Sequence, residues 1–206
     1  MKKTIIALLL AALLVMSCGC SKLGDLVNGG AKSDSDTQTT EAVNTVDIST
    51  LDLTGLTKYE DGAFSVYYPE SCTITSENTE IQGQTMIMQA VDSNNGDNIN
   101  IIKTEGSALS LIAVSEDTFK DEISASLGED CNFQMKRFER NTNGKNSILA
   151  QYTASMYGMN VEFCQVMVAD KDGHFYTVTY SCFPDYGSAG VDSVFGTSIK
   201  TITVEG

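Results

Sequence analysis

The sequence predicts an α+β domain, an α/β/α sandwich in which helices flank an antiparallel meander sheet. Three observations support this prediction. From residue 53 onward, short segments rich in aromatic and β-branched residues recur. Turn-forming stretches such as Asn143-Gly144 separate several of these segments and predict hairpins, which join antiparallel neighbours. Two other segments repeat their apolar residues at the spacing of a helix.

The first half of the domain contains three predicted strands and one predicted helix. Residues 64–68 alternate in polarity and end at Pro69, whereas residues 86–91 and 98–103 are joined by a turn. We expect a helix over residues 115–127, because Ser115 can cap its first turn and apolar residues follow at every fourth position. Gly128 is expected to end this helix in the left-handed conformation.

Strands dominate the second half of the domain. Residues 132–140 and 146–157 flank the Asn143-Gly144 turn, and residues 159–168 and 175–183 flank a turn at residues 170–173. A weak helix is expected over residues 188–197, followed by a closing strand over residues 199–204. Consecutive hairpins favour an antiparallel sheet whose two faces the helices can cover.

Composition limits the possible partners. The chain has 206 residues, of which 27 are Asp or Glu and 13 are Lys or Arg, so its formal net charge is −14. Nucleic-acid binding is not expected, because cationic groups are needed to neutralise phosphates. Mutual repulsion of the acidic groups favours a soluble monomer. The single histidine excludes any mechanism that needs two imidazoles.

The N-terminus has the pattern of a targeting signal. Lys2 and Lys3 precede an apolar run over residues 5–15. This run is shorter than the ~20 residues that a helix needs to cross a bilayer, but it is typical of a signal peptide. The sequence Val-Met-Ser-Cys follows at residues 15–18. This motif resembles the lipobox of bacterial lipoproteins.

The lipobox resemblance implies an anchored, exported protein. Residues 1–17 would be removed as a signal peptide, and the thiol of Cys18 would carry the lipid. Cys20 is the rival lipidation site, but the residues before it lack the aliphatic side chain that Val15 supplies. Two or three acyl chains hold a protein firmly at a membrane without a spanning segment. The expected location is the outer face of the bacterial cytoplasmic membrane, or the outer membrane where the organism has one.

Residues 18–52 are predicted to form the lipidated cysteine and a flexible tether. Residues 29–50 are rich in Ser, Thr, Asp, Asn and Gly and contain no aromatic residue. Such a segment buries too little apolar surface to offset the entropy lost on ordering. A coil of this length typically reaches roughly 30 Å. The globular domain, predicted over residues 53–206, would therefore stand clear of the lipid surface.

The domain resembles the PsbP-like and Mog1-like superfamily over about residues 57–204. Three features carry the resemblance: Phe-x-Val-x-Tyr-Pro at residues 64–69, the central amphipathic helix, and the Ser-Ile-x-x-Ile tail at residues 198–202. The Trp that often follows the Tyr-Pro motif is absent, and Cys72 lies near that point. Members act as photosystem accessory subunits, regulators of small GTPases, or bacterial lipoproteins of unknown role. The resemblance implies binding or assembly work more than catalysis.

The predicted domain contains four cysteines and no CxxC pair, which argues against zinc and thioredoxin-like sites. They are Cys72, Cys131, Cys164 and Cys182. If residues 170–173 form a three-residue loop with a bulge, Cys164 faces Tyr180 and Cys182 faces Glu162. The two cysteines would then lie on a diagonal of ~7–8 Å, too long for an easy disulfide. We therefore predict four buried thiols.

No catalytic, cofactor-binding or metal-binding residue is predicted. His174 is interpreted as a solvated turn residue, because the sequence places no nucleophile or carboxylate to pair with it. The turn at residues 92–97 carries oxygen-bearing side chains at Asp92, Asn94 and Asp97. These residues resemble part of a calcium loop, but a hairpin turn accounts for them and is the preferred interpretation.

Two further groups of residues have both structural and functional interpretations. The only basic cluster surrounds one hairpin and contains Lys136, Arg137, Arg140 and Lys145. Protection of a strand edge is favoured for it over an anion site. Four tyrosines follow the long strands: Tyr152, Tyr157, Tyr176 and Tyr180. Core packing is expected for them, with a ligand-stacking surface as the alternative.

These observations favour a membrane-anchored lipoprotein of the cell envelope, a non-catalytic module that binds a protein or a small molecule. One alternative is an assembly factor or chaperone for other exported proteins. A second is a hydrolase that uses carboxylates. The hydrolase is disfavoured, because the sequence shows no nucleophile–base pair, metal set or phosphate loop. We expect no cofactor and no nucleic-acid partner.

The lipobox assignment gives a direct test. Replacing Cys18 with Ala should abolish labelling by a radioactive fatty acid and move the protein out of the membrane fraction, because the thiol is the acyl acceptor. Cys20→Ala is the matched control and should keep both the label and the membrane location. Labelling that persists in Cys18→Ala would move the lipid to Cys20 or refute the anchor.

Overall fold

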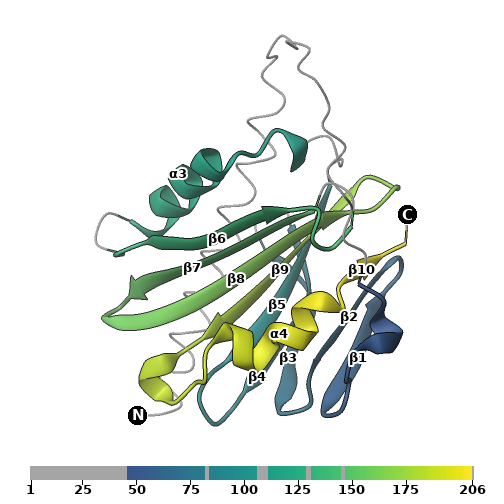
Figure 1. Ribbon diagram of the computed structural model, residues 1–206, viewed down its shortest axis with the longest axis horizontal. Helices are drawn as coiled ribbons and strands as arrows, with labels where there is room; N and C mark the ends of the chain where they lie inside the picture. The colour runs from purple at the N-terminus through teal and green to yellow at the C-terminus, as the bar shows by residue number, and fades with distance from the viewer. Residues whose placement is uncertain (1–45, 82–83, 106–110, 129–130, 145–146, 206) are drawn as a thin grey trace.

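The computed structural model describes residues 46–81, 84–105, 111–128, 131–144 and 147–205. Within them, antiparallel strands form two sheets, accompanied by two α-helices and two short 3-10 helices (Figure 1). The sheet-dominated α+β class is therefore confirmed. The predicted signal peptide, Cys18, Cys20 and most of the predicted tether lie outside the described residues. No helix in the described ranges is long and apolar enough to cross a membrane.

The larger sheet has seven strands. In spatial order they are β3 (Cys72–Ile81), β4 (Gln84–Asp92), β5 (Asn98–Glu105), β9 (His174–Cys182), β8 (Met159–Ala169), β7 (Ile148–Met156) and β6 (Gln134–Arg140). Strands β6 to β9 form the predicted meander, but they are only part of this sheet. The sheet consists of two meanders, β3 to β5 and β6 to β9, joined where β5 pairs with β9. The chain leaves after β5, forms helix α3 (Glu116–Leu127), and returns at the far edge of the sheet (Figure 1).

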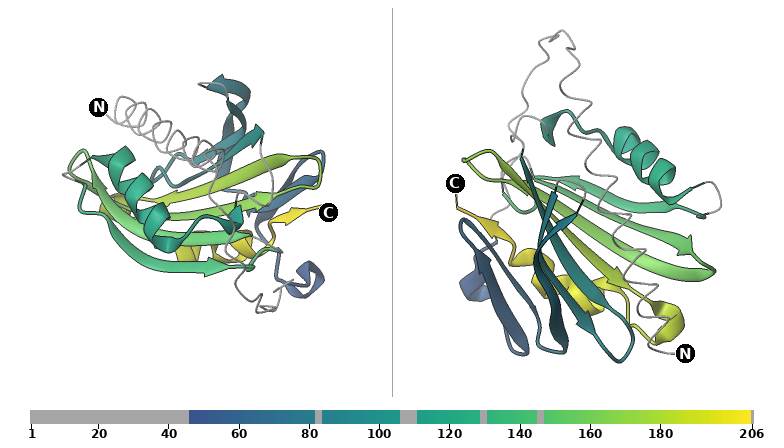
Figure 2. Two further views of the ribbon diagram at one scale, coloured as in Figure 1. Left: turned by 90° about the horizontal axis from the view of Figure 1, so that it is seen from above. Right: turned by 180° about the vertical axis from the view of Figure 1, so that it is seen from behind.

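A second sheet and helix α4 (Val191–Lys200) lie side by side on one face of the larger sheet (Figures 1 and 2). In this second sheet, β2 (Phe64–Pro69) pairs with β1 (Leu56–Asp61) and with β10 (Thr203–Val204). Phe64 stacks on Tyr176 with ring centroids 4.8 Å apart, and Phe195 of α4 meets Tyr180 at 4.9 Å. These contacts unite β2, α4 and the centre of the larger sheet in one core.

Helix α3 packs against the opposite face, over the strands near β6. Ser115 caps the helix as predicted, since its Oγ accepts a hydrogen bond from the Thr118 N–H at 3.0 Å. Phe119 and Ile123 are fully buried in a second apolar cluster that includes Tyr152. Gly128 ends the helix at φ 89° and ψ 168°, so its φ is positive but the expected left-handed conformation is not adopted.

The sequence does not predict strands β1 and β3, because most of their side chains are polar. Strand β3 lies at the sheet edge, where Thr, Ser and Glu side chains face solvent and hide the apolar alternation. The C-terminal elements were also misplaced. Helix α4 extends to Lys200, so it includes the first two residues of the strand expected over residues 199–204. The helix continues this far because Ile199 is buried one turn after Phe195. Only Thr203 and Val204 then pair with β2.

Two loops also differ from expectation. The connection between β6 and β7 spans residues 141–147, so it is longer than the two-residue hairpin expected at Asn143-Gly144. The 3-10 helix η1 (Ile48–Thr50), capped by Asp47, lies inside the range predicted as tether. The other 3-10 helix, η2 (Pro184–Tyr186), follows β9.

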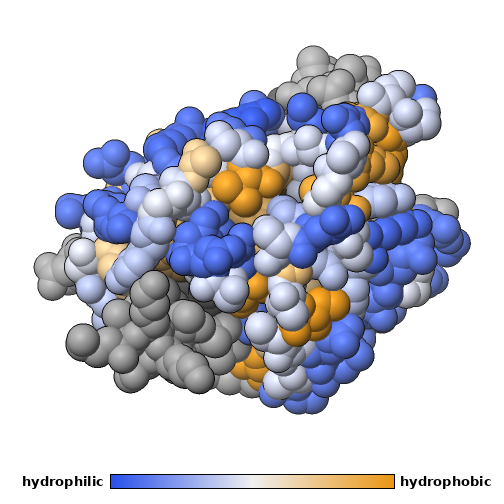
Figure 3. Space-filling model, turned by 90° about the horizontal axis from the view of Figure 1, so that it is seen from below, coloured by the Kyte–Doolittle hydropathy of each residue, from blue (hydrophilic) through white to orange (hydrophobic). Residues whose placement is uncertain are grey.

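The surface seen from below is mainly hydrophilic, with apolar residues in small separate patches (Figure 3). This pattern agrees with the large excess of acidic residues. Among the described residues, the exposed large apolar side chains are Val46, Ile112, Tyr157 and Tyr186.

All four described cysteines are buried and free. The strand register confirms that Cys164 faces Tyr180 and that Cys182 faces Glu162. Burial raises the pKa of both Cys72 and Cys164 to about 12, and it also raises the pKa of Cys182. These three side chains are therefore neutral thiols at physiological pH, and neutral buried thiols are poor nucleophiles.

Thiol titration checks this arrangement. A chain of residues 21–206 contains only the four domain cysteines. Without reductant, it should react slowly with a thiol reagent while folded and should titrate four thiols in denaturant, because burial and not a disulfide protects them. Two or no thiols in denaturant would show disulfides and contradict the structure. The same titration after reduction is the control.

Candidate functional site

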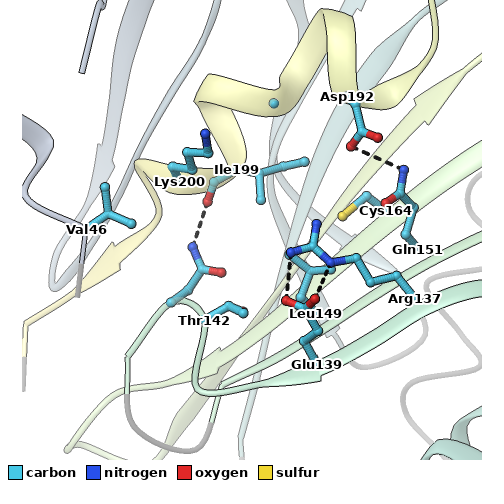
Figure 4. Close-up of a pocket in the computed structure, with 12 residues that line it drawn as sticks. Val46, Arg137, Glu139, Thr142, Leu149, Gln151, Cys164, Asp192, Ile199 and Lys200 are labelled. Atoms are coloured by element: carbon cyan, nitrogen blue, oxygen red, sulfur yellow. Dashed lines mark hydrogen bonds and ion pairs between the residues drawn. The ribbon is translucent and has the colours of Figure 1, made fainter. Parts of the chain in front are cut away.

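A groove of about 630 Å³ opens beside helix α4, over the part of the sheet formed by β6, β7 and β8 (Figure 4). Its floor includes the buried side chains of Leu149, Cys164 and Ile199. Val46 lies at one end of the groove. On α4, Gly196 borders the groove and has no side chain to fill it. The space beside it is empty, since a Cβ at that position would meet nothing within 4 Å.

The charged and polar walls of the groove are largely paired. Arg137 and Glu139 form a bidentate pair, with Nε–Oε1 at 2.6 Å and Nη2–Oε2 at 2.7 Å. These hydrogen bonds raise the pKa of Arg137 and lower the pKa of Glu139. Gln151 Nε2 donates to Asp192 Oδ1 of α4 at 3.3 Å, and Figure 4 shows both pairs. With Lys200 at the rim, the formal charges that line the groove balance.

Two polar atoms among the groove residues are buried without a hydrogen-bond partner. They are Thr142 Oγ1 and Asn143 Oδ1, both in the loop between β6 and β7. The amide of Asn143 donates to the Ile199 carbonyl at 2.6 Å, which fastens this loop to α4. An unpaired buried polar atom costs roughly 1–3 kcal/mol.

The structure divides the predicted basic cluster among different partners. Lys136 pairs with Glu162 at 3.1 Å, and Arg137 pairs with Glu139. The Arg140 guanidinium donates to the carbonyl oxygen of Leu111 at 3.1 Å and to that of Val114, so it fastens β6 to the segment before α3. Lys145 lies outside the described residues. The described members do not form one anion site, and they do lie on an edge strand.

Core packing is confirmed for three of the four tyrosines. Tyr152, Tyr176 and Tyr180 are at most 1% exposed. The expectation is wrong for Tyr157, which is 71% exposed in the turn between β7 and β8 and has a φ of 53°. The hairpin brings its side chain beyond the end of both strands, where no core remains to cover it.

The turn at residues 92–97 uses its oxygen atoms within the protein. Asp92 Oδ1 accepts the Asn94 N–H at 2.8 Å. The Asp97 carboxylate is buried and accepts from the Phe183 N–H at 3.0 Å and from the Ser188 hydroxyl at 2.7 Å. Burial raises the pKa of Asp97. Asp97 thus fastens the loop after β9, and no group of three potential ligands suited to a metal occurs among the described residues.

His174 has a carboxylate partner, Asp170, that the sequence does not predict. His174 Nδ1 lies 2.8 Å from Asp170 Oδ2, and the Tyr176 hydroxyl donates to the same oxygen at 3.3 Å. Glu105 Oε1 lies 3.8 Å from Nε2, beside a pocket of about 310 Å³ that His174 helps to line. The signal was present as an Asp and a His on either side of a tight turn.

Comparisons with known proteins give structural neighbours only. No family model and no curated protein matches the sequence. The Ran-binding protein Mog1p of Saccharomyces cerevisiae aligns with 72% of this chain and 95% of its own, at 8% identity and a TM-score of 0.47. A Bacteroides thetaiotaomicron protein aligns with 72% of this chain and 48% of its own, at 11% identity and a TM-score of 0.41.

A Pseudomonas aeruginosa protein of unknown function, PA94, aligns with 71% of this chain and 94% of its own. Its identity is 11% and its TM-score is 0.36. Mog1p belongs to the superfamily that the sequence motifs resemble. At these identities and TM-scores, the similarity concerns the fold and carries no argument about function.

The Asp170 contacts predict a pH-dependent contribution to stability. Burial alone would raise the pKa of Asp170, but hydrogen bonds from the backbone and side chain of His174 lower it below the ordinary value of 3.8. A carboxyl whose pKa is lower in the folded state stabilises the fold above its unfolded pKa, and this contribution is lost as the pH falls through the folded pKa.

We expect Asp170→Asn to lower the free energy of unfolding at pH 7 by roughly 1–3 kcal/mol. The difference from wild type should shrink below about pH 4. Urea unfolding at pH 7, 5 and 3 measures it. Asp172→Asn, which changes an exposed carboxylate in the same turn, is the control. An equal difference at pH 7 and pH 3 would contradict the role of the Asp170 charge.

Proposed function

We propose that this chain is a lipid-anchored, non-catalytic module of the cell envelope whose groove beside α4 binds an extended segment of a partner protein. The observation that carries the proposal is the groove itself. It combines an apolar floor and balanced charges on one open surface. The anchor rests on the lipobox motif that ends at Cys18.

The chemistry of the groove favours a protein segment over an ionic ligand. Arg137 already holds Glu139, so this charge is not free to recognise an anion. An extended segment offers apolar side chains to the floor and backbone N–H groups to exposed acceptors such as the Asp192 carboxylate. An assembly factor or chaperone would use the same surface for exported clients.

Gly196 allows the groove to be filled without damage to the fold. It lies inside α4 and lines the groove, and its φ is not positive. Leucine has the higher helix propensity, and the difference from glycine is about 1 kcal/mol. Because a Cβ at this position meets nothing within 4 Å, Gly196→Leu should fold with equal or greater stability while its side chain occupies the groove.

The test is photo-crosslinking in native membranes. A photoreactive phenylalanine analogue replaces Lys200, which is exposed at the rim of the groove. We expect a discrete protein adduct that Gly196→Leu removes. Ser193→Leu, the same new side chain at an exposed α4 position outside the groove, should keep the adduct. An adduct that survives Gly196→Leu, or that both variants remove, would refute groove binding.

A further inference from the structure

His174 and Glu105 place two potential metal ligands side by side where β9 begins and β5 ends. The two residues lie directly opposite each other in the strand register, so their side chains share one face of the larger sheet. His174 Nε2 is 3.8 Å from Glu105 Oε1, which is too long for a hydrogen bond. The side chains of His174 and Glu105 are 28% and 90% exposed, so an ion from solvent can reach both.

The other ring nitrogen of His174 is held by Asp170. Nδ1 lies 2.8 Å from Asp170 Oδ2, and the Asp170 side chain is only 2% exposed. This carboxylate is itself fixed, because it accepts the backbone N–H groups of Asp172 and His174 at 2.9 Å each. The Tyr176 hydroxyl also donates to it, at 3.3 Å. The orientation of the imidazole is therefore set by a buried and well-anchored partner.

The Asp170 contact leaves the lone pair of the ring on Nε2. Burial alone would raise the pKa of Asp170, but hydrogen bonds from His174 keep it below the ordinary value, so this carboxyl is ionised at neutral pH. An ionised carboxylate only accepts hydrogen bonds, so the neutral imidazole carries its proton on Nδ1. A histidine that binds a metal normally donates its other ring N–H to a carboxylate or a carbonyl in this way.

The spacing and charge of the two donors suit one divalent ion. Zinc ligands lie ~2.1 Å from the ion, so one ion can bridge donor atoms that are up to ~4.2 Å apart. Tetrahedral coordination would bring the two atoms to ~3.4 Å, and the exposed side chain of Glu105 is free to make this small movement. The carboxylates of Asp170 and Glu105 together balance the two positive charges of the ion.

A pocket of about 310 Å³ gives room for the rest of the coordination shell. Both donors line it, as do Asn78, Thr85 and Thr104, whose polar groups can hold water molecules. Lys103 also lines the pocket, but its charge is offset by Asp61, whose Oδ2 lies 3.5 Å from Nζ. This pocket shares no lining residue with the α4 groove, so it is a separate site.

The donor chemistry selects the class of ion. An imidazole nitrogen suits Zn²⁺, Ni²⁺ and Cu²⁺, whereas Ca²⁺ and Mg²⁺ prefer oxygen ligands. We propose that His174 Nε2 and the Glu105 carboxylate bind one divalent transition-metal ion, with water in the remaining positions and Asp170 as the positioning residue. Structural zinc sites have four protein ligands, so a site with two is open to exchange and to further ligands.

The experiment exploits the fact that the chain contains a single histidine. It uses the full chain in detergent, without an affinity tag and with Cys18→Ala and Cys20→Ala to remove rival thiols. Zn²⁺ should shift the His174 ring resonances in NMR spectra, and calorimetry should show one ion bound per chain. Ca²⁺ and Mg²⁺ at the same concentrations should leave these resonances unchanged.

Glu105→Gln should weaken Zn²⁺ binding at least about tenfold, because loss of a ligand costs no less than loss of an outer-shell partner. The side chain is exposed, so this variant should keep the Tm, which separates ligand loss from a folding defect. Glu70→Gln, which changes an exposed carboxylate outside the pocket, is the matched control and should bind Zn²⁺ as wild type does.

Asp170→Asn tests the positioning role. An asparagine amide can donate as well as accept, so it no longer confines the ring proton to Nδ1. This variant should mix the two imidazole tautomers in nitrogen NMR spectra, which a purely structural contact would not do, and should weaken Zn²⁺ binding about 10–100-fold. No binding at millimolar Zn²⁺, binding that leaves the His174 resonances unshifted, or equal binding by Glu105→Gln and wild type would overturn the proposal.

Discussion

The pairing of β5 with β9 is the contact on which the rest of the structure depends. It joins two meanders that are separate in the sequence, through eight residue pairs from Asn98↔Ser181 to Glu105↔His174. Its register decides which side chains of β5 and β9 enter the α4 core. A slip of one residue would exchange the two faces of the slipped strand, so Ile99 and Ile101 would leave the core.

The two ends of β9 are each held by a buried carboxylate. Asp97 binds the backbone after the strand through the Phe183 N–H, and Asp170 binds the turn before it through the His174 N–H. Each carboxylate also accepts a side-chain hydrogen bond, from Ser188 and from Tyr176 respectively. Both carboxylates, including Asp97 of the turn that resembles part of a calcium loop, thus fix the position of the central strand. This explains their burial in an otherwise acidic, solvated protein.

The α4 groove arises from incomplete coverage of one face of a wide sheet. The small sheet and α4 cover the central strands on one face, which leaves the α4-side surface of β6 and β7 open at the groove. On the other face, α3 packs near β6.

The sequence by itself determined the local elements and the fate of the cysteines. The alternation over residues 64–68, the strand candidates at residues 86–91 and 98–103, the cap at Ser115 and the turn at residues 170–173 predicted their elements correctly, because each depends on neighbours along the chain. The same turn fixed Cys164 opposite Tyr180. Tertiary structure alone decided the rest. The β5–β9 pairing and the hydrogen bond from Asn143 to the Ile199 carbonyl at the groove depend on distant segments meeting. Periodicity reports which face of a strand is apolar, but it does not report which strand lies beside it.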